Sequence, residues 1–390
     1  MKETRGKISK PDLNLVINNV AHKIRLYNTN IHVEEIQDIV ERELMTSGMK
    51  DIAQSYIRYR YLHNLARSQY QELIDAIADK LQGRSIQNQN ANIDEESFGG
   101  KIGEASDIIM RKYALDYIIS PMARNNHLNN EIYIHDLNAY AVGMHNCLSV
   151  PFDELLKNGF NTRQTDVRPA QSVNTAFQLV AVIFQLQSLQ QFGGVSATHL
   201  DWTMVPYVRK SFAKHFRDGV KYLQPWDDYN RVPSELSFDD IEANDSHNNK
   251  AYHYAIDMTE KEIYQAVEGM YHNLNTLQSR SGNQLPFTSI NYGTCTLPEG
   301  RMIIKALLDT SIKGIGKLHR TSIFPCGIFQ CMKGINRKPG EPNYDLFLLA
   351  LKSTALRLYP NYANVDWSGN AGYDVNDPKT YFSTINKTVA

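Results

Sequence analysis

The sequence predicts an α/β fold preceded by a helical segment, and three observations carry that prediction. Apolar side chains recur at helical spacing up to Leu81. A polar break rich in Gln, Asn and Ser follows, from Gly83 to Asn92. Beyond it, helical patterns alternate with short apolar runs, which is typical of an α/β architecture. We therefore expect a helical domain at 1–82 and a larger α/β domain at 83–390.

The helical segment divides into three predicted helices. Ser9 and Pro11 suit an N-cap and a first turn, so the first helix should begin there. A second amphipathic pattern covers Val33 to Leu44, and a third begins near Lys50. These helices should form a unit of their own.

The larger domain begins with the glycine-containing segment NANIDEESFGGKIGEAS, which stands ahead of a helical stretch ending near Met122. A loop at a helix N-terminus can bind a phosphate through free backbone N–H groups. A tight turn followed by a capping residue is the alternative interpretation of this segment. FGGKIG is neither a GxGxxG nor a Walker pattern, so the motif does not decide between them. Both interpretations stay open.

The next segment predicts a half-buried strand, because Ile132 and Ile134 alternate with Tyr133 and His135 before Asp136. His135 is either a positioned polar group or an ordinary hydrogen-bonded residue. Further on, the fragment HNCLSV contains Cys147. A free cysteine is commonly a small buried hydrophobe, and the nearby histidine does not establish a reactive pair.

A long helix is predicted from Ala170 to Phe192, ending at the glycine pair 193–194. Gln171, Gln178 and Gln185 line up on one face at heptad spacing, which fits a partner helix, a ligand or a solvated surface.

Further helices are expected at Pro206–Phe216, Thr259–Ser279 and Met302–Ile315. PFTSINYGTCT predicts a strand with alternating faces, and SIFPCGIFQC a buried strand.

Composition excludes several classes of function. The 41 basic and 42 acidic side chains give a net charge of -1, which argues against nucleic-acid or anionic-membrane partners. No stretch approaches the roughly 18 apolar residues of a membrane span. The four cysteines form no CxxC pair and the amino terminus lacks a signal-peptide pattern, so we expect a cytoplasmic protein with reduced thiols. Cys326 and Cys331 should lie on opposite faces of a strand, which argues against a metal site in this chain.

Six segments in order resemble class III anaerobic ribonucleotide reductases. They are NANIDEESFGGKIGEAS, NEIYIHDLNAY, HNCLSVPFDELLKNGF, QQFGG, PFTSINYGT and PNYDLFLLALKSTALRLYPNY, within Gln87 to Thr384. The resemblance implies a ten-stranded α/β barrel that encloses a finger loop. It also implies a homodimer that reduces ribonucleoside triphosphates to 2′-deoxyribonucleotides by thiyl-radical chemistry, with formate as the reductant.

The resemblance also assigns residues. Cys147, preceded by Asn146 as in the family's Asn-Cys motif, matches the cysteine that carries the thiyl radical, and His135 of the IHD motif matches a residue near the substrate. Arg168 and Gln171, with Lys214 further on, match positions that bind the specificity effector, although a relative has an acidic residue in place of Arg168.

The segment HVEEIQDIVERELMTSGMKDIAQSYIRYRY resembles the later part of an ATP-cone, which senses ATP against dATP. Complete cones begin with a basic, glycine-containing strand pair, and here only Lys2 to Lys7 precede the first helix. We therefore expect a partial or degenerate cone.

At the other end, the family continues from its FST motif into a Met-Gly-Cys-Arg segment, whereas here Ser383 and Thr384 are followed by INKTVA. We expect the second catalytic cysteine, the zinc-binding CxxC pairs and the glycyl radical to lie outside this chain. The chain should then need a complementary carboxy-terminal polypeptide and a radical-SAM activase. The alternative is a catalytically inactive nucleotide-binding or assembly fragment.

Overall fold

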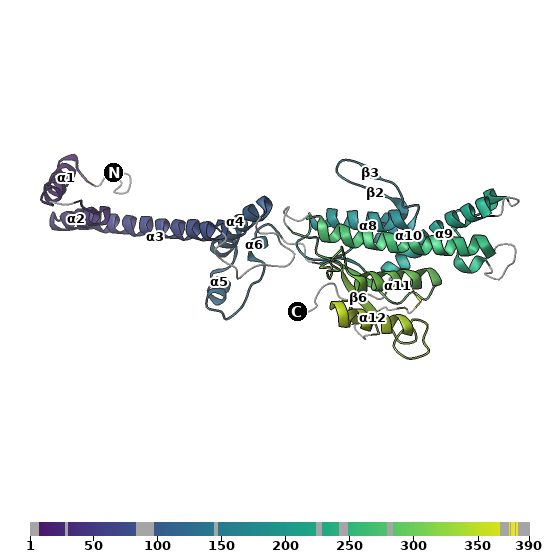
Figure 1. Cartoon of the computed structure of the whole chain (residues 1–390). Helices are drawn as coiled ribbons and strands as arrows, with labels where there is room; N and C mark the ends of the chain where they lie inside the picture. The colour runs from purple at the N-terminus through teal and green to yellow at the C-terminus, as the bar shows by residue number, and fades with distance from the viewer. Residues whose placement is uncertain are drawn as a thin grey trace. The chain divides into compact units, whose positions relative to one another are not determined.

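The computed structural model describes residues 8–27, 30–82, 97–143, 147–223, 228–241, 249–278, 284–366, 374, 376–378 and 380. The contacts within the chain divide it into two compact units, Met1–Arg84 and Ser85–Ala390. The first is helical where described, and the second holds a parallel sheet with helices (Figure 1). The predicted α/β class with a helical front region is confirmed.

The first unit contains α1 (Lys10–Arg25), α2 (Val33–Thr46) and α3 (Lys50–Leu81). The predicted cap is confirmed, because the Ser9 hydroxyl accepts a hydrogen bond from the Asp12 amide. The apolar faces of the three helices meet in a small core of Val16, Val20, Ile39, Leu44 and Ala53.

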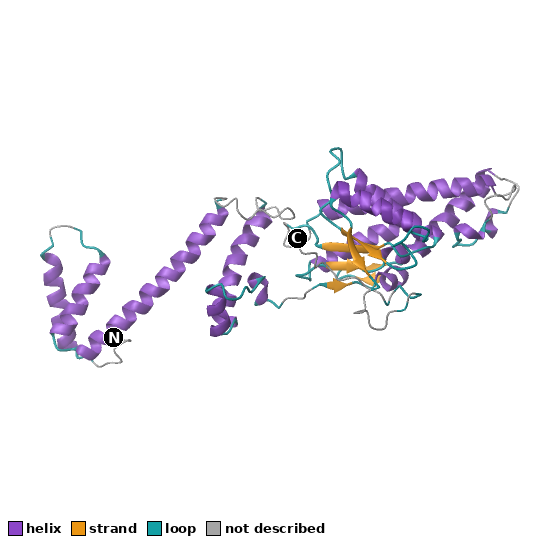
Figure 2. Ribbon diagram, turned by 90° about the horizontal axis from the view of Figure 1, so that it is seen from below, coloured by secondary structure: helices purple, strands orange, loops and turns teal. Residues whose placement is uncertain are grey.

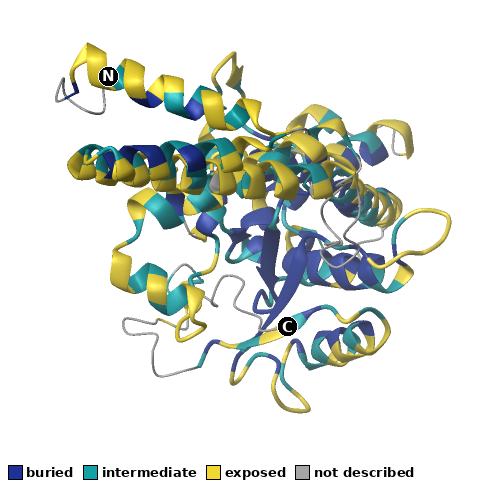
Figure 3. Ribbon diagram, turned by 90° about the vertical axis from the view of Figure 1, so that its left-hand side faces the viewer, coloured by how far each residue is buried: buried dark blue, intermediate teal, exposed yellow. Residues whose placement is uncertain are grey.

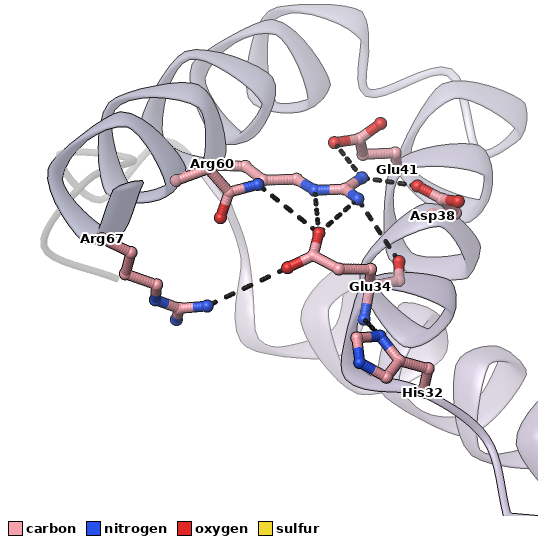
Figure 4. A network of polar contacts seen from close by, with 7 residues as sticks. His32, Glu34, Asp38, Glu41, Arg60 and Arg67 are labelled. Atoms are coloured by element: carbon pink, nitrogen blue, oxygen red, sulfur yellow. Dashed lines mark hydrogen bonds and ion pairs between the residues drawn. The ribbon is translucent and has the colours of Figure 1, made fainter. Parts of the chain in front are cut away.

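A charged cluster joins α2 to α3 on the outside of this core (Figure 4). The Arg60 guanidinium lies 2.7 Å from Glu34 Oε2, 2.6 Å from Asp38 Oδ1 and 3.0 Å from Glu41 Oε1. The hydrogen bond from Arg60 lowers the pKa of the Glu34 carboxyl below its usual range. One guanidinium from α3 thus holds three carboxylates presented by α2.

The second unit is built on five parallel strands in the order β1-β4-β5-β6-β7. Because this order never reverses, right-handed crossovers place the connecting helices on the same side of the sheet. This winding is typical of a barrel rather than of a doubly wound sheet. Closure to ten strands stays a prediction. The strands are β1 (Leu148–Ser149), β4 (Val195–Ala197), β5 (Thr288–Tyr292), β6 (Cys326–Cys331) and β7 (Asn361–Asn364).

Helices cover one face of this sheet (Figure 2). Side chains from that face, including Val195, Ile290 and Phe329, share one apolar core with the helices. The strands of the sheet centre are correspondingly buried (Figure 3). The helices are α7 (Phe152–Asn158), α8 (Val173–Ser188), α9 (Leu200–Leu223), α10 (Asn249–Thr276), α11 (Pro298–Lys313) and α12 (Tyr344–Arg357).

Smaller elements complete the described part of this unit. A hairpin, β2 (Phe160–Asn161) and β3 (Asp166–Val167), precedes α8. Residues 97–143 form α4 (Phe98–Tyr113), a π-helical turn (Ala114–Ile118), α5 (Pro121–Leu128) and α6 (Leu137–Tyr140), and short 3-10 turns lie at Tyr229–Arg231 and Phe238–Asp240. Ser97 caps α4 by accepting from the Gly100 amide, as the turn-and-cap interpretation of FGGKIG requires.

One of the three strand predictions needs correction. The predicted strand at 132–136 is wrong, because this segment is a largely exposed loop that ends with Asp136 at φ 60°. The strand predicted in PFTSINYGTCT is confirmed as β5, and its faces alternate: Ile290 and Tyr292 lie in the apolar core, whereas Ser289 and Asn291 lie on the other face. All five residues are buried, because a central parallel strand is covered on both sides. The buried strand in SIFPCGIFQC is confirmed as β6.

Two helices have boundaries that differ from the predicted ones. α8 ends at Ser188, before the glycine pair, and Gln171 precedes the helix rather than belonging to it. Gln185 hydrogen-bonds Asn273 on α10, whereas Gln178 is exposed, so the glutamines divide between a partner helix and the surface. α9 begins at Leu200 with Pro206 inside it, which extends the predicted helix toward the amino terminus.

Candidate functional site

Cys147 stands directly before β1 at an edge of the sheet. Of the four cysteines it is the exposed one, whereas Cys295 and Cys326 are buried and Cys331 is intermediate. Two backbone hydrogen bonds hold the strand that follows, from Leu148 N to Gly194 O at 3.0 Å and from Val150 N to Ser196 O at 2.9 Å. The buried-hydrophobe interpretation of Cys147 is therefore wrong.

The sheet face opposite the helices is rich in polar side chains. Ser149 pairs with Ser196, Ser196 with Ser289, and Ser289 with Cys326, so these four residues form one row across four strands. Cys147 stands two residues before Ser149, so the alternation of β1, continued by one residue, places it on the side of this face. We call this surface the polar face and define it as Ser149, Ser196, Ser289, Cys326, Asn291, Ile328 and Gln330.

Several polar atoms of this face are buried without a partner among the described residues. They are Ser196 Oγ, Ser289 Oγ and Gln330 Oε1, and all three residues are 0% exposed. A buried polar atom that makes no hydrogen bond costs about 1–3 kcal/mol. Such atoms are uncommon in folded proteins, and a group of them on one face indicates a place where a ligand supplies the partners.

At the carboxyl end of β4 lies a chain of hydrogen bonds that we call the His199 clamp: Thr198, His199, Asp153 and Thr203. His199 Nδ1 lies 2.9 Å from Thr198 Oγ1, and Nε2 lies 2.9 Å from Asp153 Oδ2. The other carboxylate oxygen of Asp153 accepts from the Thr203 hydroxyl. The clamp ties the first turn of α7, directly after β1, to the turn between β4 and α9.

A second polar junction joins β4 to β5. Asp201 is fully buried, and its Oδ2 accepts from the amides of Gly293, Thr294 and Cys295 at 2.9, 3.0 and 2.9 Å. Burial raises the pKa of Asp201, and the backbone N–H donors oppose that shift. The junction fixes the turn after β5 relative to the start of α9.

The structure tests two residues near the expected active site differently. His135 is exposed in the loop before α6 and pairs with the neighbouring Asp136. No hydrogen bond between described residues joins it to the polar face. Asn146 lies outside the described residues. The proximity of these two residues to a substrate stays a prediction.

The three candidate effector residues surround the junction of α8 with α9. Arg168 and Gln171 precede α8, Lys214 lies on α9, and all three side chains are exposed. The start of α8 contacts α9 through Val173 N, which donates to Ser211 Oγ at 3.0 Å. Ser211 lies one turn before Lys214, so the structure brings Gln171 and Lys214 to one junction without linking them by a hydrogen bond.

The helical unit carries a hollow of about 740 Å³ between its three helices. Apolar side chains dominate its lining, and Tyr56 and Tyr59 of α3 form part of it. The Tyr59 ring also lies beside that of His63, with ring centroids 4.4 Å apart and ring planes tilted by 54°. The hollow could accept a flat aromatic group. Val16, Val20, Ile24, Val40, Leu44 and Ile52 line it as well.

Two kinds of site are not found in the described part of the chain. It holds no group of three or more His, Cys, Asp or Glu side chains placed to bind a metal ion. None of its helices has the length and apolar character needed to cross a membrane. Burial raises the pKa of Cys295, Cys326 and Cys331, so these thiols stay protonated at neutral pH.

Sequence reasoning missed the clamp and the Asp201 junction. The signal available was the polar quartet Thr198, His199, Asp201 and Thr203 directly after the short apolar run that became β4. In a parallel sheet the carboxyl ends of the strands gather functional groups, so that quartet could have marked the edge. The partner residue Asp153 lies 46 positions away from His199, which local patterns do not connect.

Comparison with known proteins gives two family matches. Residues 89–380 match the family described as anaerobic ribonucleoside-triphosphate reductase, and residues 2–65 match the ATP cone domain. The reductase of Haemophilus influenzae is 32% identical over 339 residues, which is 86% of this chain and 44% of that protein. The reductase of Enterobacteria phage T4 is 30% identical over 279 residues, covering 71% of this chain and 42% of that protein.

Solved structures of the anaerobic ribonucleotide reductase from Thermotoga maritima are also similar. The one in complex with dATP and CTP is 14% identical, has a TM-score of 0.48, and covers 80% of this chain and 50% of that one. The chain spans less than half the length of the curated relatives that it matches. The family match covers most of the chain, so this protein belongs to the anaerobic ribonucleoside-triphosphate reductase family.

Proposed function

We propose that this chain provides part of the active site for the anaerobic reduction of ribonucleoside triphosphates, with Cys147 as the thiol that exchanges a hydrogen atom with the ribose. The observation that carries the proposal is the position of Cys147. It stands at the edge of the polar face, whose buried Ser196, Ser289 and Gln330 atoms lack partners.

The polar face suits a ribose better than an apolar ligand. Ribose hydroxyls both donate and accept hydrogen bonds, and the unpartnered hydroxyls of Ser196 and Ser289 can do the same. The Gln330 Oε1 atom adds an acceptor. Without a ligand, these buried polar atoms make no hydrogen bond, which costs free energy. A substrate that supplied their partners would recover this free energy and be held in a defined orientation.

The proposed chemistry balances as follows. A thiyl radical at Cys147 removes a hydrogen atom from the ribose, and the 2′-hydroxyl takes up a proton and leaves as water. Formate is oxidised to carbon dioxide and supplies two electrons and one proton, while solvent supplies the second proton. Cys147 then returns its hydrogen atom to the ribose carbon, which regenerates the thiyl radical. A glycyl radical, as in the glycyl-radical family to which this protein belongs, would generate the thiyl radical. The sheet's contribution is to keep the reacting carbon near Cys147 and away from bulk water.

We further propose that the chain acts with a polypeptide matching the remaining length of its relatives and with a radical-SAM activase. The test is anaerobic reconstitution of these three components with a ribonucleoside triphosphate and formate. Formate-dependent 2′-deoxynucleotide should form, and Cys147→Ala should abolish it. Cys331→Ala is the matched control, because Cys331 points to the opposite face of its strand and its loss should leave turnover largely intact.

Two results would count against this function. Equal activity of Cys147→Ala and the wild-type chain would show that Cys147 takes no part in the reaction. A stable complex that binds nucleotides and forms no product would support the alternative, a nucleotide-binding or assembly role without catalysis.

A second proposed function is effector binding by the helical unit, which the ATP cone match favours. The base would enter the hollow beside Tyr56 and Tyr59. Calorimetry of the full chain with ATP and dATP tests this. Tyr59→Ala should weaken binding at least about tenfold if the ring stacks on the base, and Tyr70→Ala should not, because Tyr70 is exposed on α3 and does not line the hollow.

A further inference from the structure

The strand next to Cys147 has little backbone support of its own. β1 is an edge strand two residues long, and its register with β4 covers only the pairs Leu148–Val195 and Ser149–Ser196. Leu148 and Ser149 are both exposed, so packing adds little. An active-site thiol on such a strand would be poorly placed unless another interaction fixed the strand.

The His199 clamp provides that interaction. Asp153 follows Cys147 by six residues and receives hydrogen bonds from both His199 and Thr203. The His199 side chain is 14% exposed and that of Asp153 is 26% exposed, so water competes only partly for this pair. A carboxylate has no proton to donate, so Nε2 of His199 must carry the hydrogen of this bond.

The turn that bears His199 is itself fixed to the centre of the sheet. Gln330 Nε2 on β6 donates to Thr198 O at 3.2 Å. Asp201, two residues beyond His199, accepts three amide hydrogen bonds from the turn after β5. The position of His199 is therefore fixed by contacts with β4, β5 and β6. The hydrogen bond from His199 to Asp153 then fixes β1 relative to these strands.

We propose that His199 and Asp153 are positioning residues that hold β1 in register with β4 and thereby set the place of the Cys147 thiol on the polar face. The consequence for turnover rests on the proposed function of Cys147. The placement of the strand does not, and it can be measured without catalysis.

The experiment is hydrogen exchange of the full chain, read at the amides of Leu148 and Val150, which donate to Gly194 O and Ser196 O. His199→Leu and Asp153→Ala should each speed exchange at these two amides by about tenfold or more, while amides of β5 and β6 change little. His199→Gln keeps an N–H near the position of Nε2 and should restore most of the protection.

His215→Leu is the matched control. His215 Nε2 lies 2.8 Å from Glu262 Oε2 in another histidine–carboxylate pair, which joins α9 to α10. Its loss should affect those helices and leave Leu148 and Val150 protected. Unchanged exchange of the two amides in His199→Leu would overturn the proposal, as would equal acceleration in β5 and β6, which would mean general loosening.

Activity separates this proposal from the proposed function. In the reconstituted enzyme, His199→Leu should lower kcat more than it raises KM, since it misplaces the thiol and leaves the polar face intact, and His199→Gln should recover kcat. If kcat is unchanged while β1 loosens, the positioning role is overturned. If the wild-type mixture is inactive while β1 loosens, the clamp stands and the proposed function fails.

Discussion

Gln330 on β6 reaches across β5 and donates from Nε2 to the carbonyl oxygen of Thr198, at 3.2 Å, beyond the end of β4. The side chain therefore lies over the polar face, and its Oε1 atom has no partner among the described residues. On the same face, Ser289 on β5 is also buried without a partner among the described residues. The protein thus keeps unsatisfied polar atoms where a hydrophobic sheet would be more stable, which is a pattern of functional sites.

This arrangement predicts that Ser289→Ala separates stability from function. Removing an unpartnered buried hydroxyl should leave the free energy of unfolding unchanged or raise it by up to about 1 kcal/mol. Activity of the reconstituted enzyme should fall, because the substrate loses a hydrogen-bonding group. Urea denaturation and turnover assays of the same preparation measure the two effects.

Ser353→Ala supplies the contrast for that experiment. Ser353 is also fully buried, but its hydroxyl donates to Tyr359 O at 2.8 Å, on α12 away from the polar face. Its loss should lower the free energy of unfolding by about 1 kcal/mol. If Ser289→Ala were as destabilising as Ser353→Ala, the Ser289 hydroxyl would have a partner after all.

A second prediction concerns the Asp201 junction. Asp201→Ala leaves three buried N–H groups without acceptors and should lower the free energy of unfolding by about 3 kcal/mol or more. Asp201→Asn retains a carbonyl oxygen and should cost less. Urea unfolding followed by tryptophan fluorescence measures both. A loss below about 1 kcal/mol in Asp201→Ala would show that water replaces the carboxylate.

The same residue predicts a dependence on pH. Burial raises the pKa of Asp201 in the folded state above its unfolded value, so the folded protein holds this proton more tightly. The contribution of Asp201 to stability is therefore greatest below an unfolded pKa of about 3.9, and it falls as the pH rises through the folded pKa. The free energies of unfolding of wild type and Asp201→Asn are measured at each pH. Their difference should fall as the pH rises, and a difference that rises with pH would contradict this prediction.

Local patterns in the sequence predicted the helices well, but they did not show which residues of different strands share one face of the sheet. Ser9 capped α1 as expected, because a cap depends on neighbouring residues. The shared polar face of Ser196 and Ser289 exists only once β4 and β5 lie side by side, although the two residues are 93 positions apart in the chain (289 − 196 = 93). The strand expected at His135 failed because alternation of four residues cannot show whether a neighbouring strand exists.

A third prediction uses the close approach of Gly300 to Cys295. A Cβ atom at Gly300 would lie 2.2 Å from Cys295 Sγ, so Gly300→Ala should lower the free energy of unfolding by about 1–3 kcal/mol through overpacking. Gly269→Ala is the control, since nothing lies within 4 Å of a Cβ at that helical position. It should stabilise α10 by about 0.5–1 kcal/mol. Thermal unfolding of both variants measures the difference, and a neutral Gly300→Ala would show that α11 can shift.

A further prediction concerns Arg60, which holds Glu34, Asp38 and Glu41 together. Arg60→Met leaves three carboxylates close to one another without a shared cation, so α2 should separate from α3 more readily. Hydrogen exchange in α2 and α3 should speed up. Arg58→Met is the control, because Arg58 is exposed on the same helix, and this substitution should have little effect. Equal protection in Arg60→Met and Arg58→Met would show that the charged cluster does not hold the helices.

Acid should reproduce the effect of removing Arg60. The hydrogen bond from Arg60 lowers the pKa of Glu34 in the folded state, so the unfolded state takes up this proton first as the pH falls. The stabilisation from this pair is therefore complete above an unfolded glutamate pKa of about 4.3, and it is lost as the pH falls through the lower folded value. An NMR titration of the Glu34 carboxyl in the full chain should show that lowered value, and Arg60→Met should return it to the ordinary range. Because the Glu34 side chain is 36% exposed, added salt should weaken the shift, and a shift that persisted in high salt would point to a cause other than the Arg60 charge.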